Sequence, residues 1–392
     1  MNTRALSVGV IYTTALLQGA TFVSLPALSR VLTAQFGISE TLYGSLYLPM
    51  VGVGAVTSLL GTTALRTFGL QPLFTMGLAA NATALFGFAI LARIPQALCY
   101  PALVATAIVL GLSLGLMGIA LNTGAMRLFP RQRARALAQL HAAIGIGAAG
   151  GPQLFSYWYE RGFWQAEPIL LLIATLALLA ISSRRRIEGL QHTGTGGGHW
   201  RHIPTRVWSR GMTTFLYGVS ESTLAAWAIL FLTQHRDASD LEAARALSAF
   251  WLCMTFGRLG GTLILRRTGA IPLVLALLCG MGVAFPLVTL AGRGSSAIVA
   301  YGLAGLACSA VFPILMGLAS EEAPDHLPQL SAILSACLLA GLGLGSFWVG
   351  PLSAEVPMEW VLRFSAIWPA LLIGTVLALR LRPNAKMAAE ES

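Results

Sequence analysis

The sequence predicts an all-α membrane protein in which twelve transmembrane helices form two six-helix bundles. Three observations support this fold class. The 392 residues are 56% hydrophobic and only 10% charged, whereas charged residues make up about a quarter of a typical soluble domain. Apolar runs of about 20 residues, the length with which a helix crosses the hydrocarbon core of a bilayer, recur along the chain. Sequence motifs also repeat between the two halves of the chain.

Each apolar run is expected to form one membrane-spanning helix, because a helix satisfies all its backbone hydrogen bonds internally. The expected spans are residues 6–28, 41–63, 70–92, 97–126, 136–158, 167–182, 211–233, 246–265, 270–292, 296–319, 328–350 and 360–381.

The longest connection between apolar runs, residues 183–210, divides the chain in two. Its Gly/Thr/His-rich middle is typical of a flexible linker, and its Arg-rich ends suit an anionic membrane surface. We therefore expect an N-terminal bundle in residues 1–182, a cytoplasmic linker, and a C-terminal bundle in residues 211–392. Three linker histidines, His192, His199 and His202, lack the cysteines and spacing of a zinc site, so no metal is predicted.

The basic residues fix the expected orientation. Most Arg residues fall in loops on the side of the N-terminus, and loops rich in Lys and Arg stay in the cytoplasm. This asymmetry explains the net charge of +10 without nucleic acid as a partner. We expect a monomer in the cell (inner) membrane, surrounded by the lipid bilayer, with both termini cytoplasmic.

One carboxylate stands out within the apolar runs. In "MTTFLYGVSESTLAAWAILFL", Met212 to Leu232, Glu221 lies near the middle of the seventh span, deeper than any other Asp or Glu. A charge at the bilayer centre costs roughly 2.5–3.5 kcal/mol on insertion scales, so such residues are usually functional. Because a buried carboxylate can take up and release a proton near neutral pH, Glu221 is the main proton-coupling candidate. A structural role, hydrogen-bonded to neighbours such as Ser220 or Tyr217, is the alternative.

Two other ionisable residues inside spans are candidates. His141, near the inner end of the fifth span, could relay protons or form a structural hydrogen bond. Arg258, in the inner half of the eighth span, could oppose the charge of Glu221, or its head group could reach the inner interface. We expect Arg258 and Glu221 to lie at different depths.

Two pairs of motifs repeat between the halves. "GTTALRTFGLQPL" from Gly61 is echoed by "GTLILRRTGAIPL" from Gly261, and the segment from Gly111 to Pro130 is echoed by that from Gly305. Repeats in the same membrane orientation indicate a transporter whose site lies between its halves, near the membrane midplane.

These loop repeats resemble the loop motif of the major facilitator superfamily, and the resemblance covers essentially the whole chain. The matching positions are Gly61, Arg66 and Gly69 in the first half, and Gly261, Arg266 and Gly269 in the second. The resemblance implies a gating role for Arg66 and Arg266, although Leu65 and Leu265 replace the usual acidic residue. "NTGAMRLFPRQRARALAQLHAAIGIGAAGGP" and "YGVSESTLAAWAILFL" most resemble the fucose-permease-like branch.

The resemblance also implies which helices face the central cavity. The first and fourth helices of each half line it, and Thr21 is the approximate counterpart of Glu221 in the first half. The candidate substrate contacts are therefore Gln18, Thr21, Asn122, Tyr217 and Trp227. Helix–helix hydrogen bonding is the alternative role of Gln18 and Asn122.

The chain is not expected to be an enzyme or to hold a cofactor. It has no phosphate-binding Gly-rich Lys loop, nucleophile elbow or HExxH motif. The leading prediction is a secondary active transporter of a small organic solute, coupled to protons (or sodium) by alternating access. Symport of a sugar or similar polar metabolite and proton-antiport export of an amphiphilic metabolite or drug are both open. A non-transporting membrane sensor or enzyme is a remote alternative.

Overall fold

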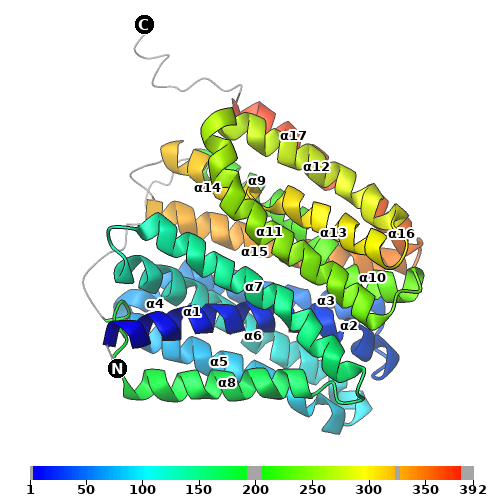
Figure 1. The fold of residues 1–392 in the computed structure, drawn as a ribbon, viewed down its shortest axis with the longest axis horizontal. Helices are drawn as coiled ribbons and strands as arrows, with labels where there is room; N and C mark the ends of the chain where they lie inside the picture. Colours follow the sequence, from blue (N-terminus) through cyan, green and yellow to red (C-terminus); the bar gives the residue numbers. More distant parts are fainter. Residues whose placement is uncertain (1–2, 192–204, 323–326, 381–392) are drawn as a thin grey trace, which may run out of the picture.

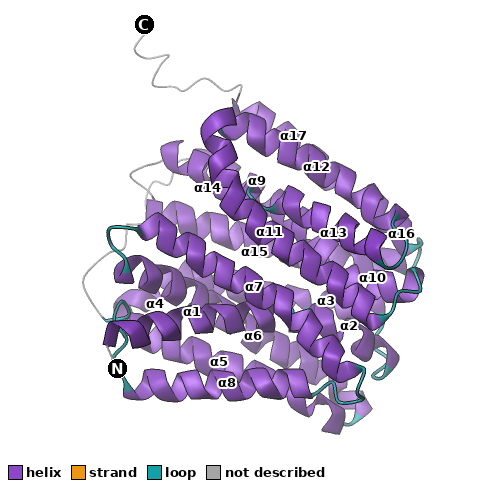
Figure 2. Ribbon diagram, in the orientation of Figure 1, coloured by secondary structure: helices purple, strands orange, loops and turns teal. Residues whose placement is uncertain are grey.

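The structure is a computed structural model that describes residues 3–191, 205–322 and 327–380. These residues form helices joined by short loops, without strands (Figure 2). The helices lie side by side, roughly parallel or antiparallel, across the molecule (Figure 1). The middle of the linker, with its three histidines, lies outside the described residues.

The helices up to residue 184 are called the N-half. They are α1 (Thr3–Phe22), α2 (Ser24–Ala34), α3 (Glu40–Ser45), α4 (Tyr47–Phe68), α5 (Leu70–Ile90), the short η1 (Leu91–Arg93), α6 (Gln96–Leu128), α7 (Arg133–Tyr159) and α8 (Ala166–Arg184).

The helices from residue 205 onward are called the C-half. They are α9 (Thr205–Ala226), α10 (Ala228–His235), α11 (Asp240–Thr268), α12 (Ala270–Leu290), α13 (Ser295–Cys308), α14 (Val311–Glu322), α15 (Leu327–Ser353), α16 (Met358–Phe364) and α17 (Ile367–Arg380).

Helices cover all twelve predicted spans, and most are apolar enough to cross a membrane. Among the described residues, nine candidate spans meet the length and hydropathy required, or ten if the bent pair α9–α10 counts as one span. The helices α7 and α11 are not among them. The prediction of an all-helical, multi-span membrane protein is therefore confirmed, while the count of twelve stays a prediction.

The first helical region of each half is broken by one non-helical residue. α1 and α2 are separated at Val23 (φ −91°, ψ 0°), and α9 and α10 are separated at Trp227 (φ −100°, ψ −3°). The break at Trp227 bends the chain by 41°. Non-helical backbone at membrane depth leaves polar groups that neighbouring helices must satisfy, so such breaks occur where protein surrounds them.

The repeated loop motif adopts the same backbone in both halves. Gly69 has φ 82° and ψ 170°, and Gly269 has φ 81° and ψ 166°. Each donates its N–H to the carbonyl four residues earlier, that of Leu65 or Leu265, at 3.0 Å. This left-handed backbone strains any residue with a Cβ, so the motif requires glycine at both positions. The internal repeat inferred from the sequence is thus visible in the structure at this loop.

Loops gather at two opposite ends of the helices. The end at which α1 begins and α8 ends is called the linker end. The far end holds the loops at residues 35–39 and 236–239. The halves contact each other chiefly along two helix pairs, α4 with α15 and α7 with α11, and α7 and α11 lie side by side in Figure 1.

Candidate functional site

A cavity lies between the two halves and includes the predicted key carboxylate in its wall. It holds about 380 Å³ of space between atoms, part of which opens outward. Its lining is Phe22, Pro26, Tyr47, Met50 and Val51 from the N-half, and Glu221, Ser222, Ala225, Ala226, Trp251, Leu342 and Ser346 from the C-half. Glu221 is the charged member of this mostly apolar and aromatic lining.

Trp251 is a further polar member of the cavity lining. Its side chain meets the Phe22 ring edge to face, with centroids 5.9 Å apart, and so joins α1 to α11 across the two halves. The indole Nε1–H is buried and has no acceptor in the part of the chain that the structure describes. An unpaired donor in the wall of a cavity is available to an acceptor on a bound molecule.

The carboxyl group of Glu221 lies beside the break between α13 and α14. At this break the Tyr217 hydroxyl donates to the Cys308 carbonyl at 2.9 Å, and Arg258 Nε donates to the Ser309 carbonyl at 3.0 Å. These two donors satisfy carbonyls that the interrupted helix leaves free. Both are also near enough to influence the carboxyl group of Glu221 electrostatically.

Arg258 of α11 is near enough to influence both His141 of α7 and Glu221 of α9 through its charge. The expectation that Glu221 and Arg258 lie at different depths stays a prediction. The His141 side chain is exposed on α7.

Three predicted substrate contacts are occupied by protein groups in this conformation. Thr21 is fully buried, and its hydroxyl accepts from the Asn81 amide at 3.3 Å within the N-half. Trp227 is fully buried and donates from Nε1 to the Ser346 carbonyl at 2.9 Å. Tyr217 is also fully buried, with its hydroxyl engaged at the helix break.

The two predicted amide contacts differ in their surroundings. Gln18 is 8% exposed on α1. Asn122 is half-buried on α6, and its Nδ2 donates to the Gly118 carbonyl at 2.8 Å. The Asn122 Oδ1 atom is buried without a partner in the described residues. Asn122 therefore keeps one acceptor that its own helix does not use.

The two loop arginines lie at the linker end, away from the cavity. Arg266 is exposed near the end of α11. The backbone of Arg66 belongs to α4, but its side chain lies outside the described residues. Their gating role stays a prediction.

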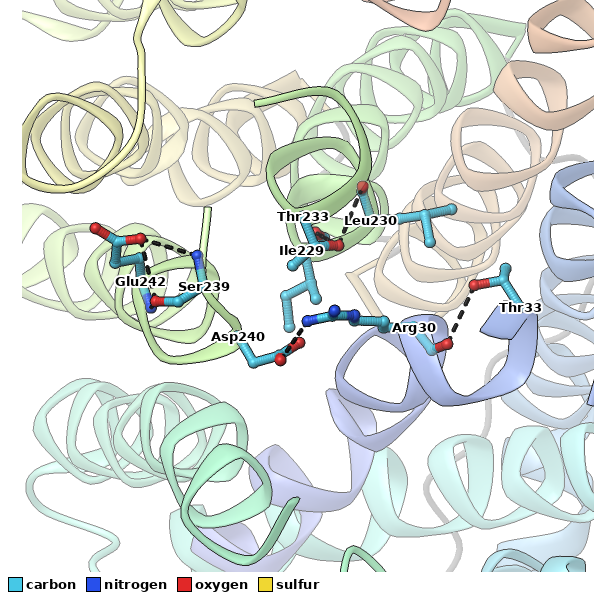
Figure 3. Close-up of polar contacts among 8 residues, drawn as sticks. All are labelled: Arg30, Thr33, Ile229, Leu230, Thr233, Ser239, Asp240 and Glu242. Atoms are coloured by element: carbon cyan, nitrogen blue, oxygen red, sulfur yellow. Dashed lines mark hydrogen bonds and ion pairs between the residues drawn. The ribbon is translucent and has the colours of Figure 1, made fainter. Parts of the chain in front are cut away.

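Ionic contacts hold the far ends of the two halves together. Figure 3 shows Arg30 of α2 extended toward Asp240, the first residue of α11, with which it forms an ion pair. His235 of α10 lies 3.9 Å from Glu40 of α3. The Gln234 amide donates to the Thr33 hydroxyl at 3.3 Å. These residues come from both halves, so the far end is closed in this conformation.

A tyrosine pair closes the cavity toward the far end. The hydroxyls of Tyr43 and Tyr47 lie 2.7 Å apart, and the Tyr43 hydroxyl donates to the Ala226 carbonyl at 2.9 Å. The Tyr43 ring meets the Trp227 ring edge to face at 5.2 Å. The group thus ties α3 and α4 to the break between α9 and α10.

Comparison with known proteins agrees with this arrangement. The sequence profile of the Major Facilitator Superfamily matches residues 10–346. The chain belongs to the Major Facilitator Superfamily. An uncharacterized MFS-type transporter from Yersinia pestis is 24% identical over 258 residues, which cover 64% of this chain and 64% of that relative. The match therefore spans less than two thirds of the relative's length.

Solved structures of several transporters share the fold. The nucleoside transporter NupG has a TM-score of 0.76 at 13% identity and covers 98% of this chain and 100% of its own. A POT family transporter in complex with a thioalcohol-conjugated peptide has a TM-score of 0.76 at 12% identity, covering 95% of each chain. A bacterial homologue of the human lysosomal transporter Spinster, inward-facing and unoccupied, has a TM-score of 0.69 at 11% identity, covering 97% and 95%. At these identities the likeness shows the fold alone.

Two residues of this superfamily member matter in the structure but were not singled out from the sequence. Arg30 and Asp240 close the far end. Nothing in the spacing of these residues signals a site, because each contact joins segments from different halves. The N-cap serine before Asp240 was the one local signal available, since it marks where α11 begins.

Proposed function

We propose that this protein is a proton-coupled secondary transporter that exports a compact amphiphilic solute by antiport. The observation that supports this is one carboxylate, Glu221, in the wall of an otherwise apolar and aromatic cavity between the halves. Of the two solute classes open from the sequence, a sugar would need several hydrogen-bonding partners. This lining offers few, so it favours a molecule with an apolar body and one donor or cationic group.

Antiport follows from having a single carboxylate for two ligands. A proton on Glu221 removes the charge that attracts a cationic or donor group, so proton and solute compete for the same group. A ligand shifts a conformational equilibrium only through different affinities for the two states. Binding of either ligand to Glu221 would therefore favour the conformational change that carries it across.

The break between α13 and α14 provides a physical link between Glu221 and the fold. When Glu221 is ionised it attracts Arg258 and Tyr217, which here donate to carbonyls at this break. When Glu221 is protonated that attraction falls, so Tyr217 and Arg258 donate more strongly to the carbonyls at the break. The charge on Glu221 would thus alter how firmly α14 is held relative to α13.

The wider movement is a rocking of two six-helix bundles, residues 1–182 and 211–392, about the cavity. If the N-terminus lies on the cytoplasmic side of the inner membrane, the closed far end faces away from the cytoplasm. His141 then lies on the cytoplasmic side of the cavity, where it could pass protons toward Glu221 by way of water.

Transport in proteoliposomes tests the proposal. Vesicles that contain the wild-type protein are loaded with a lipophilic amine, a nucleoside or a sugar. A pH gradient is then imposed across the membrane in either direction. We expect the amine to move against the direction of the proton, and Glu221→Gln to lose this gradient-driven movement. Glu355→Gln, at an exposed far-end position, is the matched control and should behave as wild type. Unchanged pH-driven transport by Glu221→Gln would exclude Glu221 as the coupling site, and co-movement of a sugar with protons would favour symport.

A further inference from the structure

A second carboxylate is buried in the N-half, away from the cavity. Glu167 lies in the first turn of α8 and is 0% exposed. Its Oε1 accepts a hydrogen bond from the Ser24 hydroxyl at 2.9 Å. Its Oε2 is buried and has no partner in the described residues. The sequence had suggested that Glu221 was alone in being so enclosed, because Glu167 sits at the very start of its apolar run.

No cation compensates this carboxyl group within the described chain. Among groups there, the Ser24 hydroxyl is the one that acts on it. The helices packed around α8 are α1, α2, α5 and α7, and α5 carries no ionisable residue. The titratable or charged residues of the other three are Arg4, Tyr12, Arg30, Arg133, Arg135, His141, Tyr157 and Tyr159. Arg30, the cation of α2, is paired with Asp240 instead.

The environment of Glu167 therefore favours its neutral form. The positive end of the α8 dipole favours a carboxylate in the first turn, but this effect is small. Removing an ionised carboxylate from water without a counter-ion is far more costly. A neutral acid carries its proton on the oxygen that no donor faces, which is Oε2.

Glu167 contacts the helix that helps to close the far end. Ser24 is the first residue of α2, directly after the break at Val23. The same short helix carries Arg30, which closes the far end against Asp240. The hydrogen bond from Ser24 to Glu167 thus attaches the start of α2 to α8.

We propose that Glu167 is a second proton-binding site, located in the N-half, and that it holds its proton while the far end is closed. The ligand of the site is a proton on Oε2, and the Ser24 hydroxyl fixes Oε1. The protein therefore carries one protonatable carboxyl group in each half, at different places along the membrane normal. This inference is independent of the role proposed for Glu221.

Infrared difference spectroscopy of the purified full-length protein tests the site directly, because a neutral carboxylic acid has a carbonyl band that a carboxylate lacks. The experiment uses a Glu221→Gln background so that Glu221 contributes nothing. We expect a neutral-acid band at pH 7 that disappears when Glu167→Gln is added. Adding Glu160→Gln instead, at an exposed position just before α8, should leave the band unchanged.

A second variant separates protonation from folding. Ser24→Ala removes the donor to Oε1, so the same band should shift to higher frequency while remaining present. If Glu167→Gln removes no neutral-acid band, or if Ser24→Ala leaves the band where it was, the proposal is overturned. Neither outcome depends on transport activity, so failure of the antiport proposal would leave this test intact.

Discussion

At the scale of single residues, two polar groups give an apolar cavity its chemistry. Glu221 offers an anionic acceptor and Trp251 offers an unpaired N–H donor, both in the same lining. A solute that satisfies both must present a donor or positive charge at one point and an acceptor at another. The aromatic rings of Phe22, Tyr47 and Trp251 would then enclose its apolar body.

The indole donor can be tested apart from the ring. Trp251→Phe keeps an aromatic side chain and removes the N–H, and a hydrogen bond contributes about 0.5–1.5 kcal/mol. We expect solutes with a matching acceptor to bind about 2–10-fold more weakly, and analogues without it to bind as before, measured by competition for transport.

Trp348→Phe is the matched control for this variant. Trp348 donates to the Thr223 hydroxyl at 3.2 Å and is absent from the cavity lining. The Trp348→Phe protein should be less thermally stable than wild type but should have the same selectivity among solute analogues. Equal losses for both kinds of analogue in Trp251→Phe would mean that the indole N–H does not contact the solute.

At the scale of helices, glycines set how closely neighbours approach. A Cβ on Gly111 of α6 would lie 1.9 Å from the Met50 carbonyl oxygen of α4. On the same helix, a Cβ on Gly118 would meet nothing within 4 Å. The spacing of these two glycines on the helix does not reveal which neighbour lies opposite each one.

These two glycines make a matched pair of variants. Gly111→Ala forces α6 away from α4 and should lower the free energy of unfolding by about 1–3 kcal/mol, as overpacking does. Gly118→Ala should be neutral or stabilising by up to about 1 kcal/mol through helix propensity. Thermal unfolding in detergent compares them, and equal effects would contradict the close α4–α6 contact.

The start of α11 carries a pH-sensitive cap. The Ser239 backbone N–H and hydroxyl hydrogen-bond the Glu242 carboxylate at 2.9 Å and 3.1 Å, and these bonds lower the pKa of Glu242. A lowered folded pKa means that the stabilisation is present above the ordinary glutamate pKa of about 4.3 and is lost as pH falls through the folded value.

Hydrogen exchange of the first turn of α11 measures this effect. Corrected for intrinsic rates, protection of residues 240–243 should fall as the solution is acidified below about pH 4. Glu242→Gln should remove much of that pH dependence. The equivalent cap at Ser39 has Leu42 in place of the glutamate, so it serves as an internal control that should lack this contribution.

At the scale of the whole molecule, polar contacts between the halves hold the far end closed. The Arg30–Asp240 pair joins α2 to α11, and it is partly exposed, with 38% and 21% of the two side chains accessible. Such pairs contribute about 0–1 kcal/mol. That is small for stability but sufficient to shift a balanced two-state equilibrium about fivefold.

Loss of this pair should open the far end more often. Spin labels at Leu42 and Arg245, exposed on opposite halves, report the separation by pulsed electron resonance. Arg30→Ala and Asp240→Ala should each raise the fraction with a long distance up to about fivefold, and the double variant should add little more. Arg161→Ala, which removes a far-end arginine within the N-half, should change nothing. Additive effects of the two alanines would show that the residues act separately.

The sequence alone determined the helical membrane class, the internal repeat and the position of Glu221 deep within an apolar run. These follow from local facts: the length of apolar runs, the glycines at residues 69 and 269 that a left-handed backbone requires, and the cost of a charge in lipid. The position of Glu221 in the cavity wall, by contrast, depends on where two halves of the chain meet.

Only the tertiary structure decided which residues share the site. Arg258 of α11 meets the break at Ser309 between α13 and α14, and Thr21 faces Asn81 inside the N-half. Glu167 is buried although it begins its apolar run, because the start of α2 lies against the start of α8. These hydrogen bonds join residues 51 to 143 positions apart in the chain. Helix packing fixes such contacts, and it leaves no periodic trace in the sequence.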